Sequence, residues 1–245
     1  MPKVVVVDGI IGAGKTSYLE VLEQDLPQHN IKVTIVREPV EKWKECGILQ
    51  RFYKDKSRWA YHFQAKAFHD RVLENIKAWE QHKDDTDIFI LERSCFTDNL
   101  FMDMLLEDKV IDNLEYQHYN EWWSLWARIM PYLPQLFIYL KPDIEVCMKR
   151  LKKRNREGEE NIPVEYQRAL EAKHDQFFQT DSIDLQQYIQ NAGSSLSSTV
   201  LLEANKGKEI KAARIVNLRT NKDFKDDEIA RKEIVAQFLD LVSTL

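Results

Sequence analysis

Short runs of β-branched and other apolar residues alternate along the chain with longer stretches whose apolar positions follow helical spacing. The short runs lie at residues 4–7, 31–36, 88–91, 136–140 and 215–218. Uninterrupted apolar strands separated by helices are typical of a parallel sheet that is covered on both faces. We therefore predict an α/β fold in one domain over residues 1–245, with a five-stranded, mostly parallel sheet flanked by helices on both faces.

Two of the helical stretches are long. Residues 51–82 contain no glycine or proline and carry apolar side chains near helical spacing, so we expect helix over most of this range. Residues 114–130 predict a second long helix, whose aromatic side chains cover more than one face. They are Tyr116, Tyr119, Trp122, Trp123 and Trp126. These aromatics either pack in the core or form a homodimer interface within region 95–130, and the sequence leaves both alternatives open.

Composition narrows the class of partner. The 40 aspartates and glutamates outnumber the 35 lysines and arginines, which gives a formal net charge of -5. This balance does not fit a broad nucleic-acid-binding surface, although a small anionic ligand is compatible with it. We see neither a charged leader nor an apolar run of membrane-spanning length, so we expect no membrane partner and a cytoplasmic location. The three cysteines, Cys46, Cys95 and Cys147, lie far apart, which favours a reducing compartment over a disulfide framework or a zinc site.

The sequence DGIIGAGKTS at residues 8–17 follows the first apolar run. Four residues separate Gly9 from the Gly14-Lys15-Thr16 triplet, which is the spacing of a phosphate-binding P-loop. Lys15 would contact the β- and γ-phosphates of a nucleotide, and Thr16 would offer its hydroxyl to Mg²⁺. We expect ATP or another nucleoside triphosphate to bind here with Mg²⁺. The binding residues would be Gly9, Gly12, Ala13, Gly14, Lys15, Thr16 and Ser17.

Charged residues follow the second and third predicted strands. Glu38 stands in REPVEKW, and Glu92 and Arg93 stand in ERS. Ligands of open α/β sheets bind at the carboxyl ends of the strands, and phosphoryl transfer to an alcohol needs a base, a metal ion and cations. We predict Glu38 as the base and Glu92 as a direct or indirect partner of Mg²⁺. Arg93 and Lys15 would be the catalytic cations.

A basic run, KRLKKRNREGEENIP, follows the fourth predicted strand. Its arginines, Arg150, Arg154 and Arg156, could close over the phosphates as a lid at residues 150–162, with Glu159 nearby. Charge alone fits a solvated helix face equally well. The position of the run after a strand end favours the lid.

These motifs together resemble the deoxynucleoside kinase family, in particular its deoxycytidine and deoxyguanosine kinase branch. The resemblance covers the chain from Val4 to about Phe178 and returns at TNKDFKD. It rests on GIIGAGKTS, EPVEKW, FYKDKSRWAYHFQ, ERSCFTD and IYLKPDIEVCMKRLKKRNREGEENIPVEY in family order, and on a tail ending FLDLVSTL. It implies a P-loop kinase fold with an arginine lid. The implied reaction transfers the γ-phosphate of a nucleoside triphosphate to the 5'-hydroxyl of a deoxynucleoside, for nucleotide salvage.

The resemblance also implies roles for individual residues. Glu38 would be the general base for the 5'-hydroxyl, and Arg93 would bind near that hydroxyl and the phosphoryl group. Other acceptor-site residues would be Tyr53 and Glu159 at the 3'-hydroxyl, Gln64 at the base edge, Trp43 and Phe63 at the pocket walls, and Arg71 with Asp98 at its polar end. On the donor side, Arg150, Arg154 and Arg156 match the lid arginines, and Asp223 and Phe224 match the loop that senses the donor base, with Phe224 stacking on it.

Spacing and chemistry support part of this pocket. Gln64 and Arg71 are seven residues apart and so share one helix face, and Tyr53, eleven residues before Gln64, falls near the same face. Asp98 accepts hydrogen bonds, so it should favour bases with an exocyclic amine over thymine, while Arg71 keeps it ionised and oriented. We therefore predict deoxycytidine, deoxyadenosine or deoxyguanosine ahead of thymidine.

The chain departs from the family pattern in two places. Met102 stands where animal members often carry an aromatic residue near the sugar, which weakens the expected discrimination against ribose. The connection at residues 180–212 is longer than its counterpart in the family.

Two other functions are compatible with a P-loop. A nucleoside monophosphate kinase would need extra cations for its phosphorylated acceptor, whereas the EPV stretch offers a carboxylate there. A GTPase-like switch would need an Asp-x-x-Gly and an Asn-Lys-x-Asp motif, and in TNKDF the aspartate comes one position early. Both alternatives fit the sequence less well than a deoxynucleoside kinase.

Overall fold

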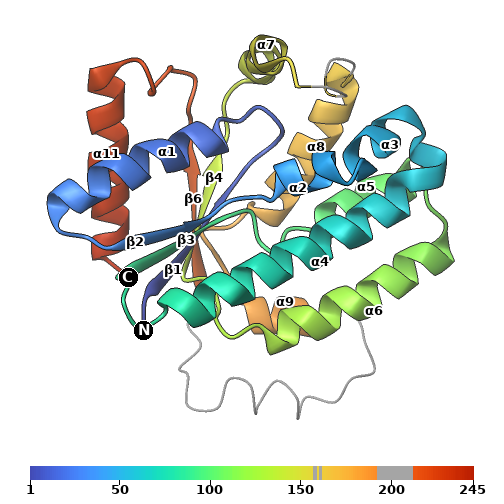
Figure 1. Ribbon diagram of the computed structural model, residues 1–245, viewed down its shortest axis with the longest axis horizontal. Coiled ribbons are helices and arrows are strands. Elements are labelled where there is room, and N and C mark those ends of the chain that lie inside the picture. The colour runs from blue at the N-terminus through green and yellow to red at the C-terminus, as the bar shows by residue number, and fades with distance from the viewer. Residues whose placement is uncertain (157–158, 160–161, 192–211) are drawn as a thin grey trace.

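A central sheet of six strands organises the computed structural model, which describes residues 1–156, 159, 162–191 and 212–245 (Figure 1). The strands are β1 (Lys3–Asp8), β2 (Val33–Val36), β3 (Ile88–Glu92), β4 (Leu136–Leu140), β5 (Ser182–Ile183) and β6 (Ala213–Leu218). Their order across the sheet is β2-β3-β1-β4-β6-β5. All neighbours pair in parallel except β5, which is antiparallel to β6. The α/β class and the five predicted strands are confirmed, but the predicted strand count was wrong by one, because β5 has only two residues and no apolar run marks it.

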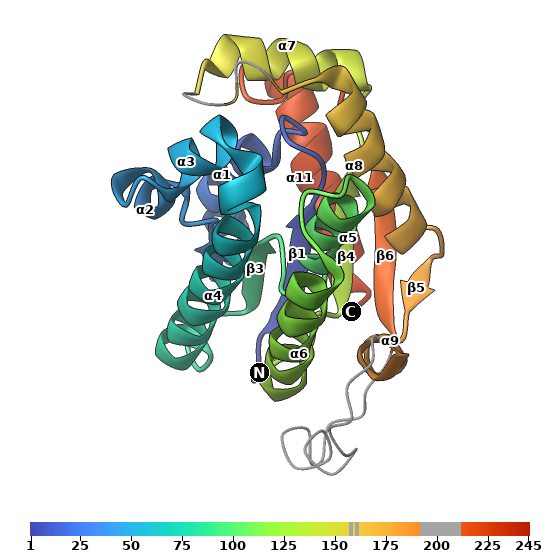
Figure 2. The same ribbon diagram turned by 90° about the vertical axis from the view of Figure 1, so that its right-hand side faces the viewer.

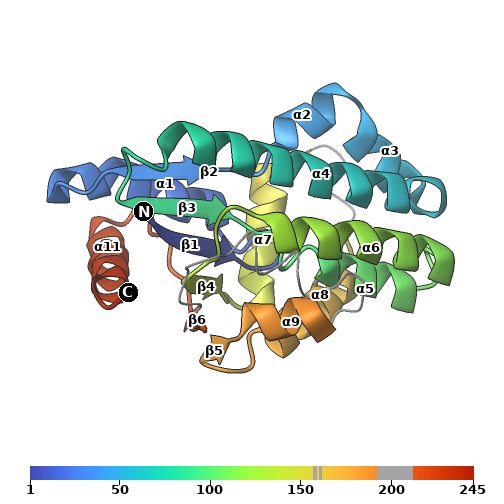
Figure 3. The ribbon, with the colours of Figure 1, turned by 90° about the horizontal axis from the view of Figure 1, so that it is seen from below.

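Helices cover both faces of this sheet. They are α1 (Lys15–Asp25), the 3₁₀ helix η1 (Leu26–His29), α2 (Val40–Glu45), α3 (Ile48–Lys54), α4 (Lys56–His82), α5 (Asn99–Glu107), α6 (Asn113–Ile129), α7 (Ile144–Arg154), α8 (Val164–Phe177), α9 (Leu185–Asn191) and α11 (Glu228–Ser243). Figures 2 and 3 show α4 and α6 side by side on one face of the sheet. Alternation along β1 divides the core: Val4 and Val6 belong to the cluster with α4 and α6, and Val5 and Val7 to the cluster with α1 and α11.

The predicted helix over residues 51–82 is interrupted at Asp55. The Asp55 backbone is not helical (φ -147, ψ 85), and its carboxylate accepts a hydrogen bond from the backbone N–H of Arg58 at 3.2 Å. Aspartate is a strong N-cap residue, so it ends α3 and starts α4 without any glycine or proline. Tyr53 therefore lies on α3 and not on the helix of Gln64 and Arg71, which corrects the shared face proposed for it.

The aromatic residues of α6 serve mainly the core. Tyr119 and Trp123 are buried, and Tyr116 and Trp126 pack against the same core cluster. Trp122 is different, because it is 51% exposed. Core packing thus accounts for four of the five aromatics, and Trp122 remains at the surface. Among the helices that the structure describes, none combines the length and apolar character needed to cross a membrane.

The sheet brings the P-loop and the charged strand ends together. β1 lies between β3 and β4, and Val7 on β1 is level with Glu92 on β3, so Glu92 and Arg93 follow β3 next to the start of the P-loop. Arg93 has a left-handed backbone (φ 61), and its N–H donates to the Val7 carbonyl at 2.9 Å. The third strand therefore neighbours the first, as the placement of Glu92 and Arg93 beside the P-loop required.

Gly9 starts the P-loop where no side chain fits. Its φ is 150, and a Cβ atom there would lie 2.6 Å from the backbone carbonyl oxygen of Leu140. Gly47 offers a comparison, because it also has a positive φ of 74 but nothing lies within 4 Å of its Cβ position.

We predict that Gly9→Ala lowers the free energy of unfolding by about 3 kcal/mol, since backbone strain and a clash with main chain add together. Gly47→Ala carries only the strain and should lower it by about 1 kcal/mol. Urea unfolding of both variants measures the difference. Equal losses would show that the contact with Leu140 does not constrain the P-loop.

Candidate active site

A cavity of about 720 Å³ opens at the carboxyl ends of β1, β2 and β3. It is lined by residues of the P-loop, α2, α3, α4, α7, the segment after β3 and the loop after β6. Every predicted site residue lines it except Gly9 and Ala13, which lie behind its wall. The fold therefore brings together residues that are far apart in the sequence.

Lys15 and Thr16 stand at the P-loop end of this cavity. The Lys15 ammonium donates to the carbonyl oxygens of Gly9 at 3.0 Å and Ile10 at 3.2 Å. Burial lowers the pKa of Lys15 to about 8, and the Arg93 charge acts in the same direction. The Thr16 hydroxyl donates to Glu92 Oε1 at 3.0 Å.

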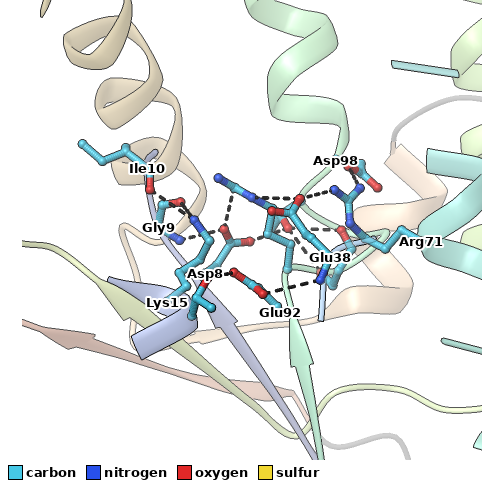
Figure 4. Close-up of polar contacts among 12 residues, drawn as sticks. Asp8, Gly9, Ile10, Lys15, Glu38, Arg71, Glu92 and Asp98 are labelled. Atoms are coloured by element: carbon cyan, nitrogen blue, oxygen red, sulfur yellow. Dashed lines mark hydrogen bonds and ion pairs between the residues drawn. The ribbon is translucent and has the colours of Figure 1, made fainter. Parts of the chain in front are cut away.

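Glu38 contacts two arginines, Arg71 and Arg93, and Figure 4 shows it beside the first of them. Arg71 Nη2 is 2.5 Å from Glu38 Oε1, and Arg93 Nε is 3.4 Å from the same oxygen. Burial acts to raise the pKa of Glu38, but three surrounding cations outweigh burial, and the pKa lies below its ordinary value. These cations are Arg93, Arg71 and Lys15. Glu38 is therefore ionised at neutral pH and able to accept a proton.

Arg71 continues from Glu38 to Asp98, with which it forms a buried ion pair. The side chains of Arg71 and Asp98 are only 4% and 2% exposed. Burial raises the pKa of Asp98 to about 6, although the Arg71 guanidinium acts in the opposite direction. Within the described residues, Asp98 Oδ2 has no hydrogen-bond partner. Asp98 thus lines the end of the cavity and carries one buried carboxylate oxygen that has no partner among the described residues.

Aromatic rings form the walls near this polar end. Trp43 and Phe63 meet edge to face, with 5.6 Å between ring centroids and 85° between planes. Phe52 stacks on Phe63 at 4.7 Å. Gln64, on the same helix as Phe63, also lines the cavity. A planar ligand with polar edges fits a pocket of this composition.

The predicted lid arginines divide into two groups. Arg154 and Arg156 both pair with Glu159, the second pair at 3.2 Å. Arg150 instead donates to backbone carbonyls, those of Ala13 at 3.0 Å and Thr220 at 2.8 Å. Residues 157–158 and 160–161 of the predicted lid, and most of the connection at 180–212, lie outside the described residues.

The loop after β6 reaches the cavity through Asp223 and Phe224. Phe224 is only 3% exposed, and its ring packs edge to face on Tyr18 at 6.1 Å. Arg150 links this loop to the P-loop, because its guanidinium donates a hydrogen bond to a backbone carbonyl of each.

Known proteins resemble this chain over almost its whole length. A family model described as deoxynucleoside kinase matches residues 5–243. The chain belongs to the deoxynucleoside kinase family. This kinase is 29% identical to a probable deoxycytidine kinase of Fowlpox virus over 244 residues, which cover 99% of this chain and 89% of that protein. It is 28% identical to deoxycytidine kinase 2 of Gallus gallus over 252 residues, or 94% of this chain and 86% of that protein.

A relative that is named as a thymidine kinase has a similar sequence identity to this chain. Mitochondrial thymidine kinase 2 of Homo sapiens is 29% identical over 180 residues, which cover 71% of this chain and 63% of that protein. The family assignment confirms the resemblance and decides against the monophosphate kinase and the GTPase-like switch. The chain is a transferase that phosphorylates deoxynucleosides with a nucleotide as phosphate donor.

The sequence analysis did not single out two residues that lie at or beside this cavity. Phe101 lines the cavity, and its ring lies 4.8 Å from the Arg93 guanidinium carbon, whereas Met102 is fully buried in the core. Phe101 and Met102 lie three and four residues after Asp98, so helical spacing alone could not decide between them. Asp8 is the other, and the only signal for it was an acidic residue directly before Gly9.

The pKa of Lys15 leads to a prediction for nucleotide binding. The kinase should bind Mg²⁺–ATP about tenfold more weakly at pH 9 than at pH 7, because Lys15 loses its positive charge above a pKa of about 8. Isothermal titration calorimetry across this range measures the dissociation constant. Lys15→Arg is the matched control, since arginine stays charged and its profile should be flat. A flat profile for the unmodified protein would contradict the pKa assigned to Lys15.

Proposed function

We propose that this kinase transfers the γ-phosphoryl group of ATP to the 5'-hydroxyl of a deoxynucleoside, preferring deoxycytidine, deoxyadenosine and deoxyguanosine to thymidine. The product would be the 5'-monophosphate, which returns free deoxynucleosides to nucleotide synthesis. The observation that carries the proposal is the continuous arrangement of Lys15, Glu38 and Asp98 in one cavity. It joins a phosphate-binding loop, an ionised carboxylate and a hydrogen-bond acceptor at the far end.

In this proposal Glu38 is the general base. Its carboxylate accepts the proton of the 5'-hydroxyl as the hydroxyl oxygen bonds to the γ-phosphorus and the bond from that phosphorus to the β,γ-bridging oxygen breaks. The products are the deoxynucleoside monophosphate and ADP. Arg93 and Lys15 stabilise the negative charge that spreads over the transferred group. The proximity of Glu38 and Arg93, at 3.4 Å, supports this division of roles.

Thr16 and Glu92 fit a Mg²⁺ ion at the P-loop. Both are hard oxygen ligands, and Mg²⁺ needs only one or two protein carboxylates because phosphates and water complete its coordination. Burial and the charge of Glu38 raise the pKa of Glu92, which indicates a carboxylate that its neighbouring cations do not fully compensate. When bound, Mg²⁺ would supply positive charge to the phosphate oxygens.

The remaining cavity residues divide between the two substrates in this proposal. Gln64, Trp43 and Phe63 hold the base of the acceptor, and Tyr53 with Glu159 holds its 3'-hydroxyl. Arg154 and Arg156, which pair with Glu159, would join the acceptor sugar to the donor phosphates. Arg150, Asp223 and Phe224 form the site of the donor base.

Replacing Glu38 tests the assignment of the base. Glu38→Gln should lower kcat by about 100-fold or more, because the amide cannot accept the proton. The free energy of unfolding should fall by about 2 kcal/mol, because the amide keeps the size of the side chain but leaves the buried Arg71 and Arg93 without the carboxylate between them. Steady-state kinetics and urea unfolding measure the two effects. Glu41→Gln, which lines the same cavity but pairs with Lys44, is the control and should keep kcat. An unchanged kcat in Glu38→Gln would remove Glu38 from the role of base.

Substrate preference tests the pocket. The kcat/KM for deoxycytidine should exceed that for thymidine by at least about tenfold, because thymine offers a carbonyl oxygen to the Asp98 carboxylate, which can only accept hydrogen bonds. Replacing Arg71 and Asp98 together by leucine should lower kcat/KM for deoxycytidine and so bring it closer to kcat/KM for thymidine. Measurement of kcat/KM for the four natural deoxynucleosides gives the result. A preference for thymidine in the unmodified protein would contradict the assignment of Asp98.

We also propose that the kinase forms a homodimer through α6. Leu114, Trp122 and Ile129 are 73%, 51% and 37% exposed, and their spacing of eight and seven residues puts them on one side of the helix. Exposed apolar side chains in a row are typical of an interface. Sedimentation velocity should give a dimer, and Leu114→Lys combined with Trp122→Lys should give a monomer. A monomer before substitution would contradict this interface.

A further inference from the structure

Asp8, the last residue of β1, is fully buried and contacts three parts of the active site. Its Oδ1 accepts hydrogen bonds from the backbone N–H of Gly9 at 2.7 Å and from Arg93 Nη1 at 2.9 Å. Its Oδ2 accepts one from the Thr97 hydroxyl at 2.5 Å. Figure 4 shows Asp8 beside Gly9 and Lys15. One carboxylate thus joins the start of the P-loop, the arginine after β3 and the residue before Asp98.

His174 on α8 lies against the contact between Asp8 and Arg93. Its Nδ1 lies 2.8 Å from the Leu170 carbonyl oxygen and donates a hydrogen bond to it. Nε2 is 3.4 Å from Arg93 Nη1 and also 3.4 Å from Asp8 Oδ1. The ring is fully buried and stacks on Tyr139 at 5.7 Å, so its orientation is determined by packing. His174 Nε2 therefore lies at the contact between Asp8 and Arg93 and touches both side chains.

The backbone of Arg93 makes such support necessary. A left-handed conformation is unfavourable for a residue with a Cβ atom and persists only where surrounding contacts impose it. The guanidinium is held between Asp8 on one side and Glu38 on the other, with the Phe101 ring 4.8 Å away. A loss of either carboxylate would let the guanidinium turn toward the remaining one.

We propose that Asp8 is a positioning residue for phosphoryl transfer, which holds the Arg93 guanidinium beside the start of the P-loop, and that His174 supports this contact through Nε2. This inference rests on the proposed function, in which Arg93 acts on the transferred group. Stability alone does not explain the arrangement, because a buried ion pair is often no more stabilising than an apolar pair of similar volume. The three hydrogen bonds of Asp8 instead connect the donor side, at Gly9, with the acceptor side, at Thr97 and Asp98.

A double-mutant cycle between Asp8 and Arg93 tests the proposal in the full-length protein with Mg²⁺–ATP and deoxycytidine. We expect Asp8→Asn and Arg93→Lys each to lower kcat by about 30-fold or more, with KM for both substrates within about threefold of the unmodified value. The double variant should be no more than about threefold slower than the slower single variant, because both changes remove the same interaction. His174→Phe keeps the stacked ring, removes the contacts of Nε2 with Asp8 and Arg93, and should lower kcat by about fivefold with the same lack of additivity toward Arg93→Lys.

Asp103→Asn is the matched control. Asp103 is a partly buried carboxylate on α5 that accepts a hydrogen bond from the Tyr116 hydroxyl at 2.6 Å and does not line the cavity. Its replacement should leave kcat unchanged, as should its combination with Arg93→Lys relative to Arg93→Lys alone.

The outcomes separate this proposal from the function on which it rests. Effects of Asp8→Asn and Arg93→Lys that multiply, or a fall in thermal stability of Asp8→Asn with kcat unchanged in the folded fraction, would assign Asp8 a structural role only. If Asp8→Asn does not fold, the cycle between His174→Phe and Arg93→Lys decides, and multiplying effects there would overturn the proposal. Failure of the unmodified protein to phosphorylate any natural deoxynucleoside would overturn the proposed function, and this inference with it.

Discussion

The active site depends on a chain of buried charges that alternate in sign. Asp98, Arg71, Glu38, Arg93 and Asp8 follow one another across the carboxyl edge of the sheet, each in contact with the next. Burying any one of these groups alone would be strongly unfavourable, so each requires its neighbours. The aromatic walls of the cavity lie at the Asp98 end and the P-loop at the Asp8 end, with Glu38 between them. The position of the candidate base is thus determined from both sides.

The parallel sheet is what makes this chain possible. Because β2, β3 and β1 are neighbours and run in the same direction, their ends deliver Glu38, Glu92 with Arg93, and Asp8 to one edge. The helix α4 then passes over this edge and contributes Arg71 from a position that only tertiary packing could bring near. The same geometry buries Lys15 near three carboxylates and near Arg93. The carboxylates act to raise the pKa of Lys15, but burial and the Arg93 charge outweigh them and lower it.

Sequence analysis could find the residues whose roles depend on local pattern. The P-loop has a fixed spacing. The charged residues at the strand ends directly follow apolar runs, so they lie close to the P-loop wherever their strands neighbour the first strand. It could not find features that depend on contacts between distant segments. The support of Arg93 by Asp8 and His174 joins β1, the segment after β3 and α8, and no periodicity links them. Three smaller features also could not be read from the sequence pattern. They are which of Phe101 and Met102 lines the cavity, the break at Asp55, and the two-residue strand β5.

The central claim is that Glu38 meets the 5'-hydroxyl of a deoxynucleoside in line with the terminal phosphate of ATP. A crystal structure of the kinase with deoxycytidine and a non-hydrolysable ATP analogue measures this most directly. The account predicts a Glu38 carboxylate oxygen about 2.6–3.2 Å from the 5'-oxygen, with that oxygen facing the γ-phosphorus opposite the bridging oxygen. A complex in which the 5'-hydroxyl contacts another group, while Glu38 stays bound to Arg71 away from it, would contradict the account.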